Sequence, residues 1–75
     1  MSVTHLDTKG LKCPLPVLRA RKAMKSLAAG DLLEVESTDP SSVQDFQSFC
    51  ETTGDELVAW REDAGVYSFQ IRKAG

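Results

Sequence analysis

Glycine and proline breaks constrain the fold of this chain most, because they cut its 75 residues into short segments. No segment between two breaks has room for more than one helix or strand. The breaks lie at Gly10, Gly30, Asp39-Pro40, Gly54 and Asp63-Ala64-Gly65. Hydrophobic periodicity between them predicts strands at residues 3–7, 31–37, 57–62 and 66–73, and helices at residues 14–28 and from 39–40 to 54.

The predicted element order is βαβαββ. The first strand–helix–strand unit should join parallel strands, and the last two strands should form an antiparallel hairpin. With only two helices, the simplest arrangement places both on one face of a four-stranded mixed sheet. The expected fold is therefore an α+β two-layer sandwich, broadly of the α/β class, forming one domain over residues 1–75. A chain this short buries only about 60% of its unfolded surface, so chemistry is expected at its surface.

Alternation along the strands predicts which side chains face the helices. The residues expected on that side are Leu33, Val35, Tyr67, Phe69 and Ile71. Three apolar residues do not fit the inward pattern and are expected on the open face: Leu32, Val58 and Trp60. For Trp60 we favour partial burial under long side chains over a role in binding.

Capping residues and helical projection predict the limits and the apolar sides of the helices. Gly30 should cap the end of the first helix and Gly54 that of the second. Asp39 should cap the start of the second helix, with Pro40 in its first turn. The first helix should present one apolar arc to the core, formed by Val17, Ala20, Met24, Leu27 and Ala28.

The net charge of −2 conceals a strong asymmetry between the two parts of the chain. Residues 1–30 hold six basic residues and one acidic residue, a balance of +5, whereas residues 31–75 hold three basic and ten acidic residues, a balance of −7. The near-neutral total argues against a general polyanion binder.

No apolar run is long enough for a membrane span, and no secretory signal is visible. Two Cys and one His make a disulfide scaffold or a structural zinc site unexpected. We therefore expect a cytoplasmic, monomeric, metal-free domain.

Cys13 is the candidate reactive residue. It directly precedes Pro14, at the predicted N-cap of the first helix, where unpaired N–H groups and the helix dipole favour a thiolate. Lys12 is adjacent, and Lys9 and Arg19 are near in sequence; cations of this kind lower the pKa of a thiol. Pro14 and Pro16 should stiffen the first turn and remove N–H donors there.

A docking surface is predicted beside this thiol. The basic residues of the first helix cover much of its outer side: Arg19, Arg21, Lys22 and Lys25. Leu15 and Leu18 project onto the same charged side, although isolated surface leucines are also ordinary. We predict that Leu15, Leu18, Arg19 and Lys22 contact partners, with Arg19 and Lys22 steering the chain towards acidic surfaces.

The sequence of the second helix indicates a structural role and not a reactive site. Cys50 falls in the middle of its apolar face, and buried Cys behaves as a small inert hydrophobe. Asp45 projects to the opposite side and is expected to be solvated. The second helix is therefore expected to build the core.

The segment Leu6-Asp7-Thr8-Lys9-Gly10-Leu11-Lys12-Cys13-Pro14-Leu15-Pro16 resembles the signature of the TusA/SirA/YeeD-type sulfur carriers, which combine an Asp, a Gly-Leu pair and a Cys-Pro-x-Pro motif. The resemblance extends over essentially the whole chain, through Asp39-Pro40 to the closing Tyr67-x-Phe-x-Ile-Arg-Lys strand. It implies a βαβαββ two-layer fold and a persulfide on the motif cysteine, here Cys13. Gly10, Lys12, Pro14 and Pro16 match the supporting motif. Leu15 departs from the Glu of the tRNA-thiolation members, and other members are linked to molybdenum-cofactor maturation and sulfur oxidation.

The leading hypothesis is a sulfur carrier. It would accept persulfide sulfur on Cys13 from a donor such as a pyridoxal-phosphate cysteine desulfurase and pass it to an acceptor protein, with no cofactor of its own. One alternative is a non-enzymatic regulatory or interaction module that uses the basic helix, although the acidic remainder makes direct nucleic-acid binding unexpected. Another is thiol–disulfide exchange, which requires Cys50 to be reachable.

Overall fold

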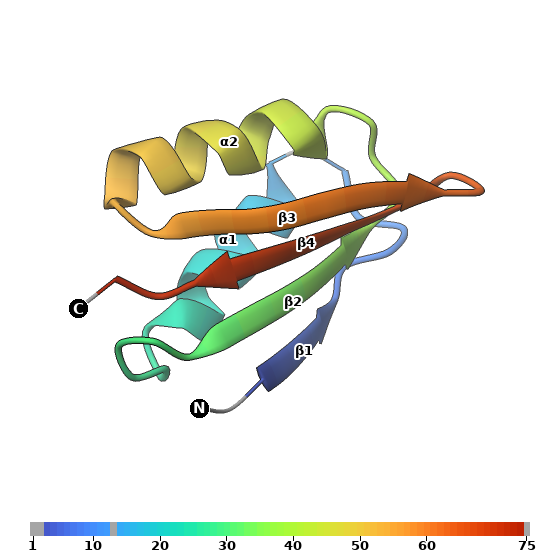
Figure 1. Cartoon of the computed structure of the whole chain (residues 1–75). Helices are drawn as coiled ribbons and strands as arrows, with labels where there is room; N and C mark the ends of the chain where they lie inside the picture. The colour runs from blue at the N-terminus through green and yellow to red at the C-terminus, as the bar shows by residue number, and fades with distance from the viewer. Residues whose placement is uncertain (1–2, 13, 75) are drawn as a thin grey trace.

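Six elements follow one another in the predicted order in the computed structural model, which describes residues 3–12 and 14–74. They are β1 (Val3–Asp7), α1 (Leu15–Met24), β2 (Leu32–Ser37), α2 (Ser42–Thr53), β3 (Glu56–Asp63) and β4 (Val66–Arg72) (Figure 1). Every strand prediction is confirmed to within a residue or two. Both helices begin later than expected, and α1 also ends earlier.

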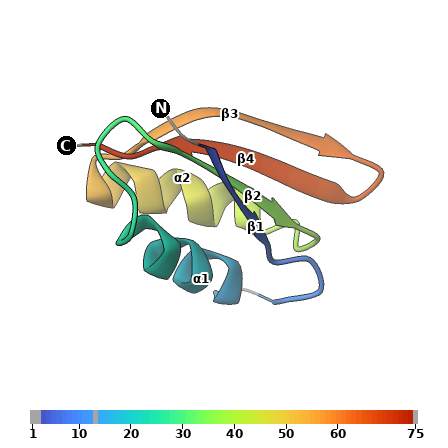
Figure 2. The same cartoon turned by 90° about the horizontal axis from the view of Figure 1, so that it is seen from below.

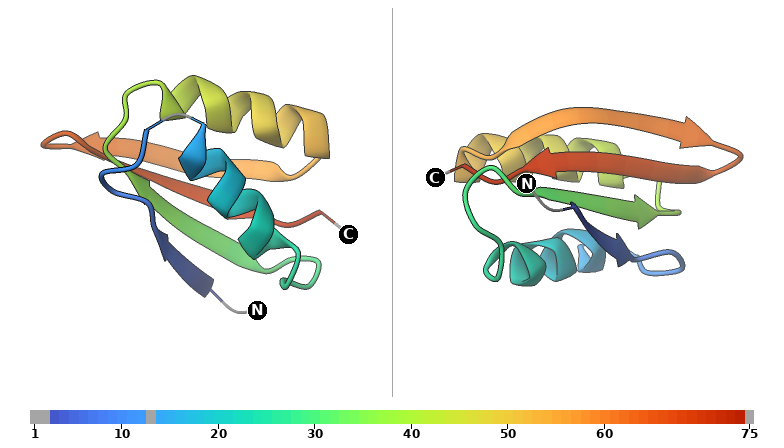
Figure 3. Two further views of the ribbon diagram at one scale, coloured as in Figure 1. Left: turned by 180° about the vertical axis from the view of Figure 1, so that it is seen from behind. Right: turned by 60° about the horizontal axis from the view of Figure 1, so that its bottom comes forward.

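The four strands form one mixed sheet in the order β1-β2-β4-β3. β1 pairs with β2 in parallel, and β4 pairs antiparallel with both β2 and β3. Both helices lie on the same face of this sheet, and no described element covers the other face (Figures 2 and 3). The predicted two-layer α+β sandwich is therefore confirmed. In the described part of the chain, neither helix is long and apolar enough to span a membrane.

The core lies between the sheet and the two helices. The strand residues predicted to face inward do so: Leu33, Val35, Phe69 and Ile71 are fully buried, and Tyr67 packs against them half-buried. Phe46 of α2 stands at the centre, with its ring centroid 4.6 Å from that of Phe69 and 6.3 Å from that of Phe49. The aromatic rings thus join α2 to the middle of the sheet.

The end of α1 differs from the prediction. The helix ends at Met24, and Gly30 lies in the turn before β2, with a φ of +88°. The ammonium group of Lys73, just after β4, donates to the carbonyl oxygens of Met24 and Leu27, each over 2.7 Å. A distant cation therefore binds the last carbonyl of α1 and the carbonyl of Leu27 in the following turn, where a C-terminal glycine was expected. Ala28 lies beyond the helix and is exposed.

The start of α2 also differs. The helix begins at Ser42, and the cap position is Ser41. Asp39 organises the preceding turn: its carboxylate accepts the Ser41 N–H over 3.0 Å, and its backbone carbonyl accepts the Ser42 N–H over 3.0 Å. Asp39 therefore leads into the helix, and the prediction that it is the cap was wrong. Gly54 ends α2 as predicted, with a φ of +81°.

Trp60 lies on the other side of the sheet from the one predicted. The pairing of β3 with β4 shifts between Leu57 and Ala59, and beyond this irregularity Trp60 stands opposite Phe69. Directly paired residues share a face, and the two rings are stacked with centroids 6.3 Å apart. Trp60 is thus 43% exposed at the edge of the helix-covered face. Strict alternation fails here because a bulge changes its phase. Leu32, next to the inward Leu33, does lie on the open face.

Candidate functional site

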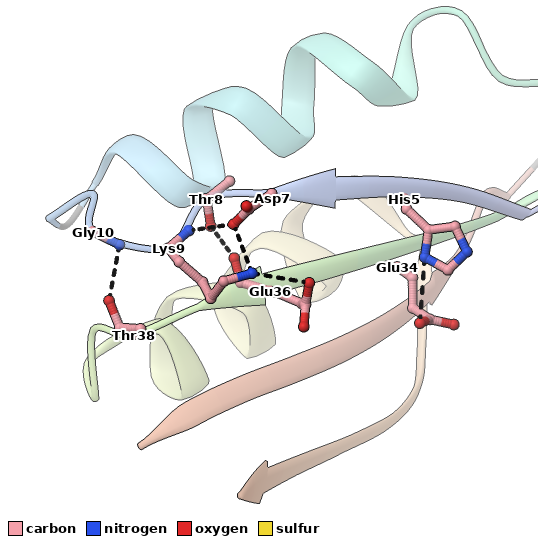
Figure 4. A network of polar contacts seen from close by, with 8 residues as sticks. All are labelled: His5, Asp7, Thr8, Lys9, Gly10, Glu34, Glu36 and Thr38. Atoms are coloured by element: carbon pink, nitrogen blue, oxygen red, sulfur yellow. Dashed lines mark hydrogen bonds and ion pairs between the residues drawn. The ribbon is translucent and has the colours of Figure 1, made fainter. Parts of the chain in front are cut away.

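The loop after β1 runs along the edge of the sheet at which β1 and β2 both end. The Thr8 N–H and the Thr8 hydroxyl both donate to the carbonyl of Glu36, the N–H over 2.8 Å. The Gly10 N–H donates to the hydroxyl oxygen of Thr38 over 2.9 Å (Figure 4). Because β1 and β2 are parallel, their carboxyl ends meet here, and residues 8–10 are held against residues 36–38.

This loop then turns into α1. Gly10 has a φ of +84°, a left-handed conformation that glycine adopts at little cost. The Leu11 N–H donates to the Thr8 carbonyl over 3.1 Å, and the Leu15 N–H donates to the Lys12 carbonyl over 2.9 Å. Cys13, the predicted reactive residue, lies outside the described residues. Its described neighbours on both sides belong to this tight turn.

The N-cap of α1 is Pro14, one residue later than predicted for Cys13, and no side chain caps the helix. The Leu18 N–H donates to the Pro14 carbonyl over 3.1 Å. Pro16 is the second helical residue and is fully buried, so it anchors the first turn against the core. The first turn of α1 contains no acidic residue. The positive end of the helix dipole is therefore not compensated from within its own first turn.

Lys9, which was expected to favour a thiolate at Cys13, is engaged elsewhere. Its ammonium group lies 3.1 Å from Asp7 and 3.2 Å from Glu36, on the open face of the sheet (Figure 4). The N–H of Lys9 and then its ammonium group lower the pKa of the Asp7 carboxyl. Hydrogen bonds to Asp7 and then to Glu36 raise the pKa of Lys9. Two carboxylates thus balance the charge of Lys9, whereas Lys12, which is adjacent to Cys13 in sequence, is exposed.

The outer side of α1 carries the predicted surface features. The four basic residues are all exposed: Arg19, Arg21, Lys22 and Lys25. Leu15 is 43% exposed and Leu18 is 51% exposed, so both leucines lie at the surface in the first turn and a half of the helix. The residues predicted to contact partners therefore form one exposed surface, which begins directly after the Cys13 position.

Two hollows flank the start of α1, and sequence reasoning found neither. One, of about 420 Å³, lies between the loop and the connection to α2, and is lined by Gly10, Leu11, Lys12, Thr38, Asp39 and Pro40. The other, of about 290 Å³, is lined from α1 by Pro14, Val17 and Arg21 and from α2 by Asp45, Ser48, Phe49, Thr52 and Thr53. Asp45 is therefore half-buried between the helices, and the prediction that it is simply solvated was wrong. Only the parallel pairing and the helix packing reveal these neighbours.

Comparison with known proteins identifies the family. Residues 4–73 match the family model described as "Sulfurtransferase TusA". The chain belongs to the TusA/SirA sulfur-carrier family. It is 46% identical over 70 residues to a sulfur carrier protein TusA of Allochromatium vinosum, covering 93% of this chain and 92% of that one. It is 47% identical over 68 residues to a TusA of Pseudomonas putida, covering 91% and 85%. A crystal structure of a SirA-like protein from Desulfitobacterium hafniense superposes with a TM-score of 0.81 at 31% identity, covering 100% of both chains.

Within this TusA-family chain, Cys50 is a core residue, as predicted. It is 6% exposed on the inner side of α2, among the buried apolar residues. Burial, with a smaller effect of the Asp55 charge, raises the pKa of its thiol to about 11. A neutral, covered thiol is neither a nucleophile nor a ready partner for disulfide exchange. Among the described residues, no three His, Cys, Asp or Glu side chains are grouped so as to hold a metal ion.

Proposed function

We propose that this chain is a sulfur carrier in which Cys13 holds transferable sulfur as a persulfide. The observation that carries the proposal is the family match over residues 4–73, which includes the Cys13-Pro14-Leu15-Pro16 motif, whose last two residues begin α1. The whole chain acts as one carrier domain. It needs no resident cofactor, because the thiol itself is the carrier group.

The proposed transfer is an exchange at sulfur. The Cys13 thiol gives up its proton to solvent, and the thiolate attacks the terminal sulfur of a persulfide on the donor. A new S–S bond forms to Cys13 while the donor's S–S bond breaks, and the donor's cysteine leaves as a thiolate that takes up a proton. No external oxidant or reductant is needed. In delivery, a nucleophile of the acceptor attacks the terminal sulfur of the Cys13 persulfide. The S–S bond at Cys13 breaks, and Cys13 leaves as a thiolate that takes up a proton.

The surroundings of the motif support this chemistry. The first turn of α1 contains no carboxylate, and Lys12 is exposed immediately before Cys13. A thiol near an uncompensated helix N-terminus and a cation has a lowered pKa and reacts faster at neutral pH. The buried Pro16 holds the start of the helix against the core. The first turn of α1 is thus held by packing on its inner side, whereas Leu15 on its outer side is exposed to partners.

The proposed partners are a sulfur donor, such as a cysteine desulfurase, and a downstream acceptor protein. Leu15 and Leu18 offer exposed apolar contacts beside the motif, and Arg19 and Lys22 add positive charge on the same helix. This combination suits docking on partner surfaces that are acidic around an apolar patch. The final product belongs to tRNA thiolation, molybdenum-cofactor maturation or another sulfur pathway.

The test is sulfur loading followed by mass spectrometry. The protein is incubated with a pyridoxal-phosphate cysteine desulfurase and cysteine, and the expected result is a gain of one sulfur atom that a reductant removes. The Cys13→Ser variant should gain nothing, whereas the matched Cys50→Ser variant should load like the wild type. A wild type that gains no sulfur from any desulfurase tested, or a gain that survives Cys13→Ser, would contradict the proposal.

A further inference from the structure

The loop that leads towards Cys13 is linked to the β2–α2 connection by the side chain of Thr38. Backbone pairing between β1 and β2 ends at Asp7 and Glu36, and Thr8 adds one more N–H bond to the Glu36 carbonyl. Two residues further on, the Gly10 N–H donates to the Thr38 hydroxyl oxygen over 2.9 Å (Figure 4). Thr38 therefore continues the connection between the two segments past the end of the sheet.

The Thr38 side chain makes this contact beyond the last strand carbonyl that accepts from the loop. The Glu36 carbonyl accepts both the N–H and the hydroxyl of Thr8. The left-handed conformation of Gly10, with a φ of +84°, turns the chain that follows it away from the strand direction. The hydroxyl of Thr38 then supplies the acceptor that continued strand pairing would otherwise have provided.

Packing alone holds this loop weakly. The hollow of about 420 Å³ described above lies between residues 10–12 and residues 38–40. Gly10, Lys12, Thr38 and Pro40 are exposed around it, and Leu11 is only half-buried. Where few apolar contacts fix a segment, polar contacts determine its conformation. The Gly10–Thr38 hydrogen bond is therefore one of the contacts that fix the loop, and it joins the loop to the β2–α2 connection.

We infer that Thr38 is a positioning residue for sulfur transfer: its hydroxyl fixes residues 10–12 and, through them, the presentation of the motif that contains Cys13. This inference rests on the proposed function of Cys13. Removal of one such hydrogen bond should lower the population of the transfer-competent loop by about two- to tenfold. The effect should appear in the transfer step, because Thr38 lies on a different segment from the α1 surface proposed to dock partners.

The experiment compares three variants with the wild type. Thr38→Val removes the hydroxyl and keeps the shape, Thr38→Ser keeps the hydroxyl, and Thr4→Val makes the same change at an exposed position of β1. The first measurement is sulfur loading by a cysteine desulfurase, resolved into kcat and KM for the carrier. The second is the pH dependence of alkylation of Cys13 by iodoacetamide, which requires no sulfur transfer.

Thr38→Val should lower kcat by about two- to tenfold with KM unchanged, and slow alkylation at neutral pH by a similar factor. Its alkylation profile should move to higher pH, because the thiol loses part of its fixed environment. Thr38→Ser and Thr4→Val should match the wild type in both measurements, and urea unfolding should show that all variants are folded.

A wild-type kcat and alkylation profile in Thr38→Val would overturn the inference. Equal losses in Thr38→Val and Thr38→Ser would also overturn it, because the hydroxyl would then not be the cause. If the desulfurase loads no protein, wild type included, the proposed function fails; the alkylation profiles then decide the role of Thr38 by themselves.

Discussion

The two helices cover the same face of the sheet but contribute differently to the molecule. α2 inserts the rings of Phe46 and Phe49 into the core and ends on its own glycine, Gly54. α1 buries smaller surfaces at Ala20 and Met24 and turns its basic residues and leucines outward. Its last carbonyl, that of Met24, accepts from a side chain beyond β4. The contacts of α2 therefore contribute more to the stability of the fold, whereas substitutions of the exposed residues of α1 should be tolerated.

Phe46→Ala should have the largest effect on stability and should confirm the role of α2. The ring is fully buried and contacts Phe49 and Phe69, so its removal leaves a cavity. We expect the free energy of unfolding to fall by about 3–5 kcal/mol, measured by urea denaturation. The same change at Leu18 on α1 should cost less than about 1 kcal/mol. A comparable loss at both positions would contradict the division between the helices.

Lys73→Met tests the dependence of α1 on a distant residue. The substitution keeps the aliphatic stem but removes the ammonium group that donates to Met24 and Leu27 over 2.7 Å each. We expect a loss of about 2 kcal/mol in the free energy of unfolding, since hydrogen bonds from charged donors are among the stronger ones. Lys25→Met, at the exposed cap position of α1, is the matched control and should change stability by less than about 0.5 kcal/mol. Equal losses of unfolding free energy in Lys73→Met and Lys25→Met would contradict a specific role of Lys73, because any loss of positive charge would then have the same effect.

A double charge reversal on α1 tests whether its outer side serves partners. Arg19→Glu with Lys22→Glu should leave urea unfolding almost unchanged, because both side chains are exposed. The kcat/KM for sulfur loading by a desulfurase should fall about tenfold at low salt, and by less at high salt, where charges are screened. Glu51→Lys, on the exposed side of α2, should have no such effect. A salt-independent loss, or none at all, would remove electrostatic steering from the proposal.

The last expected effect, which appears only at alkaline pH, concerns the buried thiol of α2. The pKa of Cys50 is raised from 9.0 to about 11 in the folded chain, so the unfolded chain loses this proton first as the pH rises. Its contribution to stability is therefore complete below pH 9 and is lost as the pH rises towards about 11. Over this range the wild type should lose more unfolding free energy than Cys50→Ala. Parallel curves for the two proteins would place the ionised thiol in contact with solvent.

Much of the fold could be predicted because it is encoded locally. The alternation of Leu33 and Val35 and the glycine at Gly54 each describe an element from a few neighbouring residues, and all these predictions are confirmed. Trp60 was assigned to the wrong face because the phase of β3 depends on an irregularity in its pairing with β4. No property of β3 alone reveals that shift.

The candidate site could be predicted only in part. The motif and the exposed leucines followed from the sequence, and the role of Cys13 stays a prediction. The ion pair of Lys9 with Glu36, and the contact between Gly10 and Thr38, join residues that are far apart in the chain. Such contacts exist only once β1 and β2 are aligned in parallel, so no local pattern predicts them.

The central place of β4 has a consequence for the synthesis of this chain. β4 is the last of the four described strands to be made, yet it lies between β2 and β3 and supplies the fully buried Phe69 and Ile71. Until it emerges from the ribosome, β2 has only β1 as a partner, β3 has none, and the ammonium group of Lys73 has not reached α1. α1 is therefore translated early, but the sheet on which it packs is completed last. A nascent chain halted at the turn before β4 should be degraded readily by proteases, and resistance should arise in one step once β4 is free.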